Sequence, residues 1–557
     1  MWKNKLKLMV LSVILLATLG IGAVIKVGDN YFEISKNLTI FGKLYRELNL
    51  LYVDETDPTK LMREAIDNML ASLDPYTNYI SASEIEDFRI RSMGQYCGIG
   101  VLVVERNGKV IITEIYEGEP AIEAGLKTGD EIIAIDNENI KTKIRTQNDI
   151  RNLLRGQANT PVLLTVIREG ETNPRKINVV RKDIKISNVP YFGMVNDKVG
   201  YITLTEFTPD AGKEVRDAFI TLRKENPNLA GIILDLRENP GGMLIEAVNV
   251  ASVFVPSNEM VVETRGRMEG AQKKYSTKDS PVDTLLPVAV LVNNHSASSS
   301  EIVTGALQDL DRAVIVGQRS FGKGLVQITR PLSYNTQMKL TTAKYYIPSG
   351  RCIQALDYSH RNPDGSVGKV PDSLKKSFKT KKGRTVYDGG GIEPDVEVKR
   401  KEYNTVTNEL QNQGVIFDFA SKFANQNAKI ADAKSFKITD EIYQQFVKYV
   451  ETCSFKYETL AEKELVKLKG LVESEHRFDN ISAEYKGLEA KLKDLKKNEL
   501  IIHKKDISEL LKLEIVKRYY YRKGIIEASF DQDEDIKAAT DVLSNKVKYG
   551  QLLSGKK

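Results

Sequence analysis

The middle of the chain alternates between short, uninterrupted apolar runs and longer segments whose apolar residues recur every three or four positions. An apolar run without polar alternation is typical of a strand buried on both faces, as in a parallel sheet covered by helices. The alternation therefore predicts a layered α/β domain over residues 185–400. The predicted strands cover residues 199–204, 231–236, 288–292 and 313–316, and the predicted helices include 215–222 and 244–253.

The pattern changes on both sides of this domain. Before it, apolar residues at helical spacing predict helices over 32–52 and 59–73, within a helical N-terminal region of residues 31–92. After it, residues 401–557 are charged and poor in glycine and proline, which predicts a helical C-terminal extension. We expect this extension to pack on the preceding domain or to hold a partner, through homo-oligomer formation or adaptor binding. It carries a seam with coiled-coil-like spacing: Phe478, Ile481, Tyr485, Leu488, Leu492 and Leu495.

The start of the chain has the pattern of a membrane-targeting segment. Three lysines within the first seven residues precede an uncharged, mostly apolar stretch over residues 8–25, and Lys26 follows it. This stretch is near the lower limit of about 20 residues for a spanning helix and is longer than a typical signal core. Residues 1–30 are thus a predicted signal sequence or membrane anchor, and a buried core helix is the weaker alternative. The positive-inside rule then predicts export to a bacterial periplasm, either free or anchored to the inner membrane.

Composition narrows the classes of function. The 557 residues are too many for one hydrophobic core and indicate several domains. A formal net charge of +6 among 81 basic and 75 acidic side chains does not indicate a nucleic-acid partner. The three cysteines are far apart and the four histidines form no ligand pattern, so the sequence predicts no disulfide framework, no metal site and no cofactor.

A strand, a sharp corner and a helix start follow one another after residue 288. Ser298 lies at the corner, and Glu301 completes a capping-box pattern that predicts the helix start. Downstream, Lys323 lies between two glycines in an apolar setting, where burial would lower the pKa of its amine from about 10.4 toward neutrality. A neutral amine can take a proton from a serine hydroxyl. Each stretch also has a plain explanation when it is considered alone: the serine stretch could be only a helix cap, and the lysine stretch could be only an exposed turn.

A second corner ends another predicted strand. Residues 235–242 read Asp-Leu-Arg-Glu-Asn-Pro-Gly-Gly and follow the apolar run that begins at residue 231. Ligands of open α/β sheets bind at the carboxyl ends of such strands, so this loop is a candidate part of a site. A strand-to-helix turn that requires glycine is the plain alternative.

The serine and lysine corners together resemble the motifs of the carboxyl-terminal processing peptidases, also called tail-specific proteases, which use a serine-lysine dyad. Residues 296–302 read Ser-Ala-Ser-Ser-Ser-Glu-Ile, and residues 321–327 read Phe-Gly-Lys-Gly-Leu-Val-Gln. The resemblance implies a layered α/β, crotonase-like or ClpP-like, serine protease core. It implies that Ser298 is the nucleophile, Lys323 the general base and Gln327 the residue that orients the lysine. It also implies an oxyanion hole formed by Gly241, Gly242 and Ser299, with the N–H groups of Gly242 and Ser299 as donors.

Residues 93–184 resemble a PDZ domain of the kind that these proteases carry. A glycine-bearing loop runs into a β-branched strand, and residues 124–130 read Ala-Gly-Leu-Lys-Thr-Gly-Asp. Glycines in the loop let successive N–H groups turn toward one point, where the terminal carboxylate of a peptide would sit while the peptide adds as a strand. The predicted peptide-binding residues are Gly98, Ile99, Gly100 and Val101.

These features predict an exported serine endopeptidase that captures polypeptides by a free, apolar, unstructured C-terminal tail. Three alternatives stay open: a peptide-binding scaffold with an inactive protease domain, an acyl-transfer or hydratase enzyme on a related fold, and a Ser-His-Asp hydrolase that uses His295.

The spacing of Lys323 and Gln327 adds one geometric expectation. Four residues of extended strand cover about 13 Å, whereas one helical turn brings such a pair to about 5–6 Å, so direct contact between Gln327 and Lys323 requires the chain to curl.

Overall fold

The computed structural model describes residues 31–140, 147–268, 270–362 and 364–555. The predicted signal sequence or anchor, residues 1–30, lies outside these ranges. Within them, no helix is long and apolar enough to cross a membrane. The chain divides into two compact units, Met1–Ser81 with Thr329–Leu340 and Ala82–Ile328 with Thr341–Lys557.

The smaller unit contains the two helices that the N-terminal pattern predicts. Residues 31–51 are helical, and α2 spans Pro58–Ala71, with the Asp57 carboxylate capping its first turn. The short strand β1 (Asn78–Ile80) pairs antiparallel with the first residues of β18 (Gln337–Tyr346). The predicted helical character of this region is therefore confirmed, with one strand added at its end.

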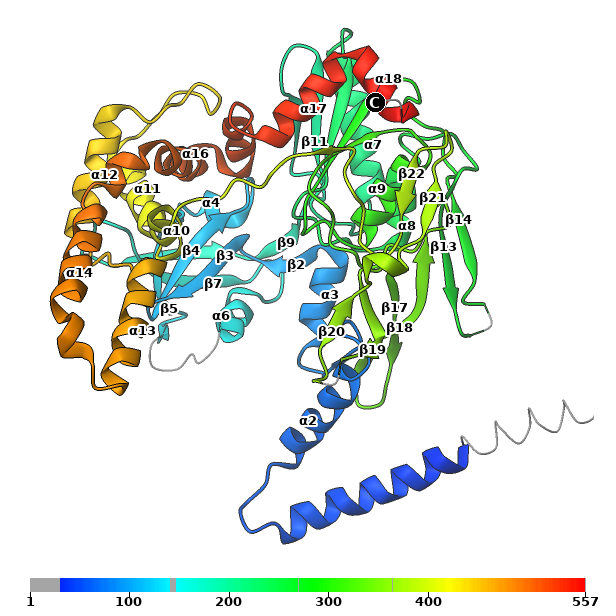
Figure 1. Ribbon diagram of the computed structural model, residues 1–557, viewed down its shortest axis with the longest axis horizontal. Coiled ribbons are helices and arrows are strands. Elements are labelled where there is room, and N and C mark those ends of the chain that lie inside the picture. Colours follow the sequence, from blue (N-terminus) through cyan, green and yellow to red (C-terminus); the bar gives the residue numbers. More distant parts are fainter. Residues whose placement is uncertain (1–30, 141–146, 269, 363, 556–557) are drawn as a thin grey trace, which may run out of the picture. The chain divides into compact units, whose positions relative to one another are not determined.

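The central sheet of the larger unit confirms the predicted alternation of strands and helices. Its order is β10-β11-β12-β15-β16-β23, and every neighbouring pair except the first is parallel. Helices α7, α8 and α9 share one apolar core with alternate strand residues, and α17 and α18 share another core with the residues between them (Figure 1). The sheet elements are β10 (Tyr191–Met194), β11 (Val199–Thr203), α7 (Ala211–Glu225), β12 (Gly231–Asp235), α8 (Leu244–Ala251), β15 (Val288–Val292), α9 (Ser299–Asp309), β16 (Val314–Gly317) and β23 (Val396–Glu397).

A second sheet and an insertion complete this core. Residues 343–346 of β18 pair with β13, and β14 lies at the far side of β13. The polar insertion that follows forms two small hairpins. The elements are β13 (Met260–Gly266), β14 (Lys273–Ser276), β17 (Leu325–Pro331), β19 (Leu356–Arg361), β20 (Val367–Lys369), η1 (Asp372–Leu374), β21 (Ser377–Lys379) and β22 (Thr385–Tyr387).

The segment that resembles a PDZ domain folds around a sheet of order β3-β4-β5-β7-β8, with β6 beside β5. Strand β3 is at one end of this order. The strands that enter and leave the domain, β2 and β9, pair with each other antiparallel. The elements, preceded by α3 (Ile85–Met93), are β2 (Gln95–Gly98), β3 (Val101–Arg106), β4 (Lys109–Ile115), α4 (Pro120–Glu123), β5 (Glu131–Ile135), β6 (Glu138–Asn139), α6 (Gln147–Leu154), β7 (Pro161–Ile167), β8 (Arg175–Val180) and β9 (Lys182–Lys185).

The C-terminal extension is helical, as predicted, but its apolar seam is only partly buried. Phe478 and Ile481 precede α14 in a short 3-10 turn, and Tyr485 is buried, whereas Leu488 and Leu495 are 50% and 62% exposed. Phe478 and Ile481 therefore lie outside the predicted helix, because α14 begins only at Ser482, and the coiled-coil-like seam stays a prediction for the rest of its length. The elements are α10 (Thr405–Asn412), α11 (Val415–Gln426), α12 (Asp440–Thr452), α13 (Leu460–Ser474), η2 (Phe478–Ile481), α14 (Ser482–Lys496), α15 (Glu499–Ile502), α16 (Lys504–Ser529), α17 (Glu534–Ser544) and α18 (Lys546–Ser554).

Candidate active site

The corner between β15 and α9 places four serines in different environments. The hydroxyls of the three buried serines donate to backbone carbonyls: Ser296 to Leu236 at 2.8 Å, Ser299 to Gly242 at 2.9 Å and Ser300 to Asn239 at 2.9 Å. Ser298 is the one serine of this group whose side chain is partly exposed. The spatial arrangement thus singles out the same serine as the motif.

The backbone of Ser298 is strained. Its φ of 55° and ψ of −112° lie in a region that residues with a side chain rarely adopt. Such outliers persist only where the surrounding contacts over-determine them, and they cluster at functional sites. A strained strand-to-helix corner also exposes a nucleophile in other hydrolases.

The glycine loop after β12 lies directly against this corner. A Cβ on Gly241 would come within 2.7 Å of the Ala297 carbonyl oxygen and 2.8 Å of the Ser298 Cβ. A Cβ on Gly242 would meet the Phe207 carbonyl oxygen at 2.5 Å. Both positions therefore require glycine for the close approach, and both have a positive φ, 98° and 149°.

Two backbone N–H groups at this junction are available to a ligand. The Ser299 hydroxyl bonds the Gly242 carbonyl, so the loop and the start of α9 are in contact. Among the described residues, neither the N–H of Gly242 nor that of Ser299 donates a hydrogen bond to another residue. Their position beside Ser298 suits donors that would stabilise an oxyanion.

Glu301 connects the serine corner to the lysine corner. Its side chain is 0% exposed and accepts four hydrogen bonds. The Oε2 atom accepts from the N–H of Ser298 at 2.8 Å and from the N–H of Lys323 at 2.9 Å. The Oε1 atom accepts from the Ser320 hydroxyl and the Gly322 N–H, both at 2.6 Å. We call this arrangement the Glu301 clamp, because one carboxylate fixes two segments 25 residues apart.

The Tyr345 hydroxyl makes a second link between the same two segments. It lies 3.2 Å from the carbonyl oxygen of Ser298 and also contacts the carbonyl oxygen of Lys323. The ring is 1% exposed in the main apolar core. The sequence predicted neither connection. Glu301 was expected only to cap α9, which it does through the Ser298 N–H.

Gln327 lies on the strand that follows the lysine. Strand β17 begins at Leu325, so residues 323–327 do not form one continuous strand. The Gln327 amide donates to the Thr341 hydroxyl of β18 at 3.1 Å. Its action on the Lys323 amine stays a prediction.

The predicted peptide-binding loop lies at the start of the PDZ sheet. The carbonyl oxygens of Ile99 and Gly100 accept from the N–H groups of Ala121 and Tyr116, each at 3.0 Å, and Val101 opens the edge strand β3. Gly98 ends β2. Tyr96 lies beside this loop: burial raises the pKa of its hydroxyl, and a hydrogen bond from the Gly100 backbone opposes this shift. No sequence pattern indicated a role for Tyr96.

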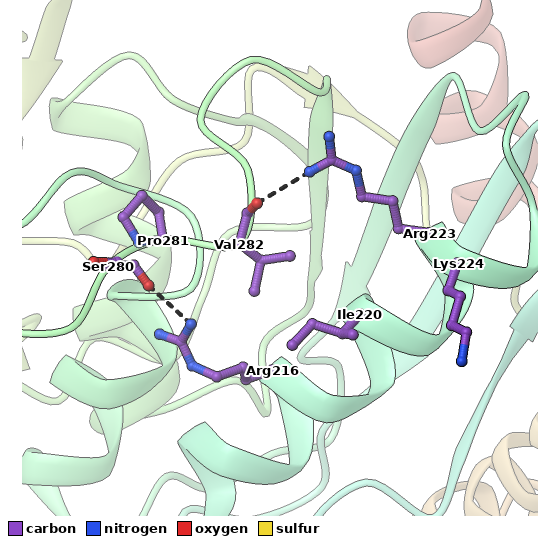
Figure 2. Close-up of a pocket in the computed structure, with 7 residues that line it drawn as sticks. All are labelled: Arg216, Ile220, Arg223, Lys224, Ser280, Pro281 and Val282. Carbon is purple, nitrogen blue, oxygen red and sulfur yellow. Dashed lines mark hydrogen bonds between the residues drawn. The ribbon is translucent and has the colours of Figure 1, made fainter.

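His295 and one surface pocket take no part in the contacts described above. His295 is exposed at the corner. A surface pocket of about 460 Å³ lies between α7 and residues 280–282, where Arg216 and Arg223 donate to backbone carbonyls of that segment (Figure 2). None of the predicted site residues lines this pocket.

Glu301→Gln tests the clamp. The glutamine side chain replaces one carboxylate oxygen with an NH₂ donor, so the two hydrogen bonds that this oxygen accepts are lost. A hydrogen bond to a charged group contributes about 1.5–3 kcal/mol, so we expect turnover to fall by about tenfold or more. Steady-state kinetics would show the loss. Glu393→Gln, at an exposed pair with Arg319, is the matched control and should leave the rate unchanged.

The same variant predicts a change in the pH dependence of stability. Burial raises the pKa of Glu301 from 4.5 to about 7. A carboxyl with a raised folded-state pKa contributes stability below its unfolded value, and this contribution is lost as the pH rises through the folded value. The wild type should therefore lose unfolding free energy relative to Glu301→Gln between about pH 4.5 and 7, as measured by urea unfolding. A difference that is flat across this range would contradict the raised pKa.

Three parts of the chain match models of known protein families. Residues 198–367 match the model of peptidase family S41, residues 97–179 that of a PDZ domain and residues 406–543 that of the C-terminal helical domain of probable PDZ-proteases. The matches and the fold confirm the predicted fold class: a layered α/β peptidase core, a PDZ domain and a helical extension.

Individual relatives agree with these matches. A carboxy-terminal-processing protease of Bartonella bacilliformis is 39% identical over 323 residues, 58% of this chain and 73% of the relative. A probable CtpA-like serine protease of Staphylococcus aureus is 30% identical over 73% of this chain and 79% of its own. Among solved structures, the photosystem II D1 C-terminal processing protease is 26% identical over 65% of this chain and 92% of its own, with a TM-score of 0.36. On the strength of its sequence relatives, the chain belongs to peptidase family S41, the carboxy-terminal-processing serine proteases.

Proposed function

We propose that this serine peptidase cleaves polypeptides upstream of a free C-terminal tail by a Ser298–Lys323 dyad. The observation that carries the proposal is the Glu301 clamp, which holds the backbones of both residues on one carboxylate oxygen. The burial of the three neighbouring serines supports Ser298 as the nucleophile.

The proposed reaction uses groups at the two corners. The Ser298 Oγ attacks the scissile carbonyl carbon while its proton passes to the neutral Lys323 amine. The N–H groups of Gly242 and Ser299 donate to the oxyanion of the tetrahedral intermediate. Collapse expels the amine product, which takes the proton back from Lys323. A water molecule, deprotonated by Lys323, then attacks the acyl carbon, and the Ser298 Oγ leaves with the proton that Lys323 returns. Gln327 orients the lysine in this proposal.

The PDZ domain supplies the selectivity for tails. A PDZ domain fits the binding of a C-terminal peptide, and we propose that the peptide adds as a strand beside β3, which is at the end of the sheet order. We propose that the loop from Gly98 to Val101 takes the terminal carboxylate. Capture at this loop raises the local concentration of the upstream segment at Ser298.

Ser298→Ala and Lys323→Ala test the dyad. The first should abolish peptide-bond cleavage, and the second should lower it by about 10²–10⁴-fold, the range of general-base catalysis. Unchanged circular dichroism would show that both variants fold. Lys224→Ala, at an exposed lysine of α7, serves as the control. Near-wild-type turnover in Lys323→Ala would remove the lysine from the mechanism.

Amidation of the substrate tests tail capture. A substrate with a C-terminal amide, or with acidic residues in place of its apolar tail, should have a kcat/KM at least about tenfold lower than its parent, because charge-assisted hydrogen bonds to the carboxylate are lost. A short peptide with the same scissile sequence but no tail is the control. Equal cleavage of the acid and the amide would show that the loop does not read the terminus.

We also propose that the protein is exported to the periplasm, with residues 1–30 either cleaved or retained as an inner-membrane anchor. The charge and hydropathy pattern of these residues supports this proposal. Cell fractionation with N-terminal sequencing should find the protein outside the cytoplasm, and a cytoplasmic protein that keeps residue 1 would contradict export. Homo-oligomer formation or adaptor binding through the C-terminal helices stays a prediction.

A further inference from the structure

The last helices of the chain form one wall of the peptidase core. Four side chains of α17 are at most 2% exposed, and they pack on the alternate residues of β12, β15 and β16 that face away from α9. The Tyr549 hydroxyl of α18 accepts from the N–H of Val288 at 3.0 Å, at the start of β15. The four α17 side chains are Ile536, Ala539, Val542 and Leu543. The extension thus covers the second face of the catalytic sheet.

An ion cluster joins the start of α17 to the glycine loop. The Arg237 guanidinium pairs with Asp235 at 2.6 Å, with Asp533 at 2.8 Å and with Asp535 at 2.9 Å. None of these side chains is more than 18% exposed. Tyr201 donates to Asp235 at 2.6 Å and closes the cluster. Two of the three carboxylates that hold Arg237 therefore come from a segment about 300 residues downstream.

Arg237 begins the loop that ends at Gly242, and the rest of this loop is tied to the serine corner. Asn239 is 0% exposed, and its side-chain oxygen accepts from the Gly241 N–H at 2.9 Å. Its backbone oxygen accepts from the N–H of Ala297 and from the Ser300 hydroxyl. Glu238, between Arg237 and Asn239, has a φ of 58°, which surrounding contacts must maintain. The loop is thus anchored by charge at one end and by hydrogen bonds at the other.

We propose that Asp533 and Asp535 are positioning residues for the oxyanion hole, so that the C-terminal helical domain completes the peptidase site through Arg237. The inference rests on the proposed role of the Gly242 N–H as an oxyanion donor. Loss of the two carboxylates leaves the guanidinium with Asp235 alone and frees the start of the loop. The N–H of Gly242 is then displaced from the position where negative charge develops.

The test is the double variant Asp533→Asn/Asp535→Asn in the full chain. Asp533 also caps α17 by accepting the N–H groups of Asp535 and Ile536, and asparagine keeps this cap, so the change removes charge rather than the helix start. Glu534→Gln is the control, because it removes one negative charge from the same turn but from a carboxylate that pairs with Lys537 instead of Arg237.

We expect kcat of the double variant to fall by about tenfold to a hundredfold, less than the hundredfold or greater loss seen when a donor is removed. The KM for a tail-bearing substrate should stay within about twofold, because tail capture is unaffected. The affinity for a peptide aldehyde, whose adduct with the serine oxygen places an oxygen in the oxyanion hole, should fall in parallel with kcat. The control should match the wild type in all three measurements.

A merely structural role gives a different result. It would lower the melting temperature while kcat and aldehyde affinity of the folded protein stay at wild-type values, and this outcome overturns the proposal. A rise in KM alone also overturns it. If the double variant melts below the assay temperature, Asp535→Asn, which keeps the Asp533 pair, gives the same comparison with a smaller expected loss in kcat. An inactive wild type would instead contradict the proposed function.

Discussion

A single buried carboxylate holds the serine corner and the lysine corner of this protein together. The Glu301 clamp fixes the start of α9 and the glycine-flanked lysine segment to the same side chain. Each of the four hydrogen bonds that it accepts offsets part of the free-energy cost of burying the carboxylate. Together with the Tyr345 hydroxyl, this common acceptor keeps the two segments at a fixed separation. The strained backbone of Ser298 is maintained by the same contacts.

The sheet supplies the frame around this carboxylate. Parallel strands β12 and β15 end side by side, so the glycine loop and the serine corner emerge at the same edge. Their carbonyl and hydroxyl groups then bond to each other, as between Ser300 and Asn239. The positions of the glycine loop and the serine corner therefore depend first on strand register and second on the hydrogen bonds between these two loops.

Much of this arrangement could be predicted from the sequence. Apolar runs located the buried strands, and motif spacing located Ser298, Lys323 and the glycine pair, because these signals are local in the chain. Contacts between distant segments left no local signal. Asp533 and Asp535 look like an ordinary acidic helix start, and nothing in their pattern points to Arg237. The spacing also did not show that α14 begins only at Ser482, after Phe478 and Ile481, because periodicity shows which residues share a helix face but not where the helix starts.

The position of α17 also orders events during synthesis. The strands of the central sheet are complete by Glu397, but the helix that covers their second face begins at Glu534. A chain made from its N-terminus must therefore carry an uncovered apolar sheet face through the synthesis of more than 130 further residues. A growing or truncated chain that lacks α17 therefore exposes the apolar residues that this helix covers, and exposed apolar surface of this kind makes a folding intermediate prone to aggregation.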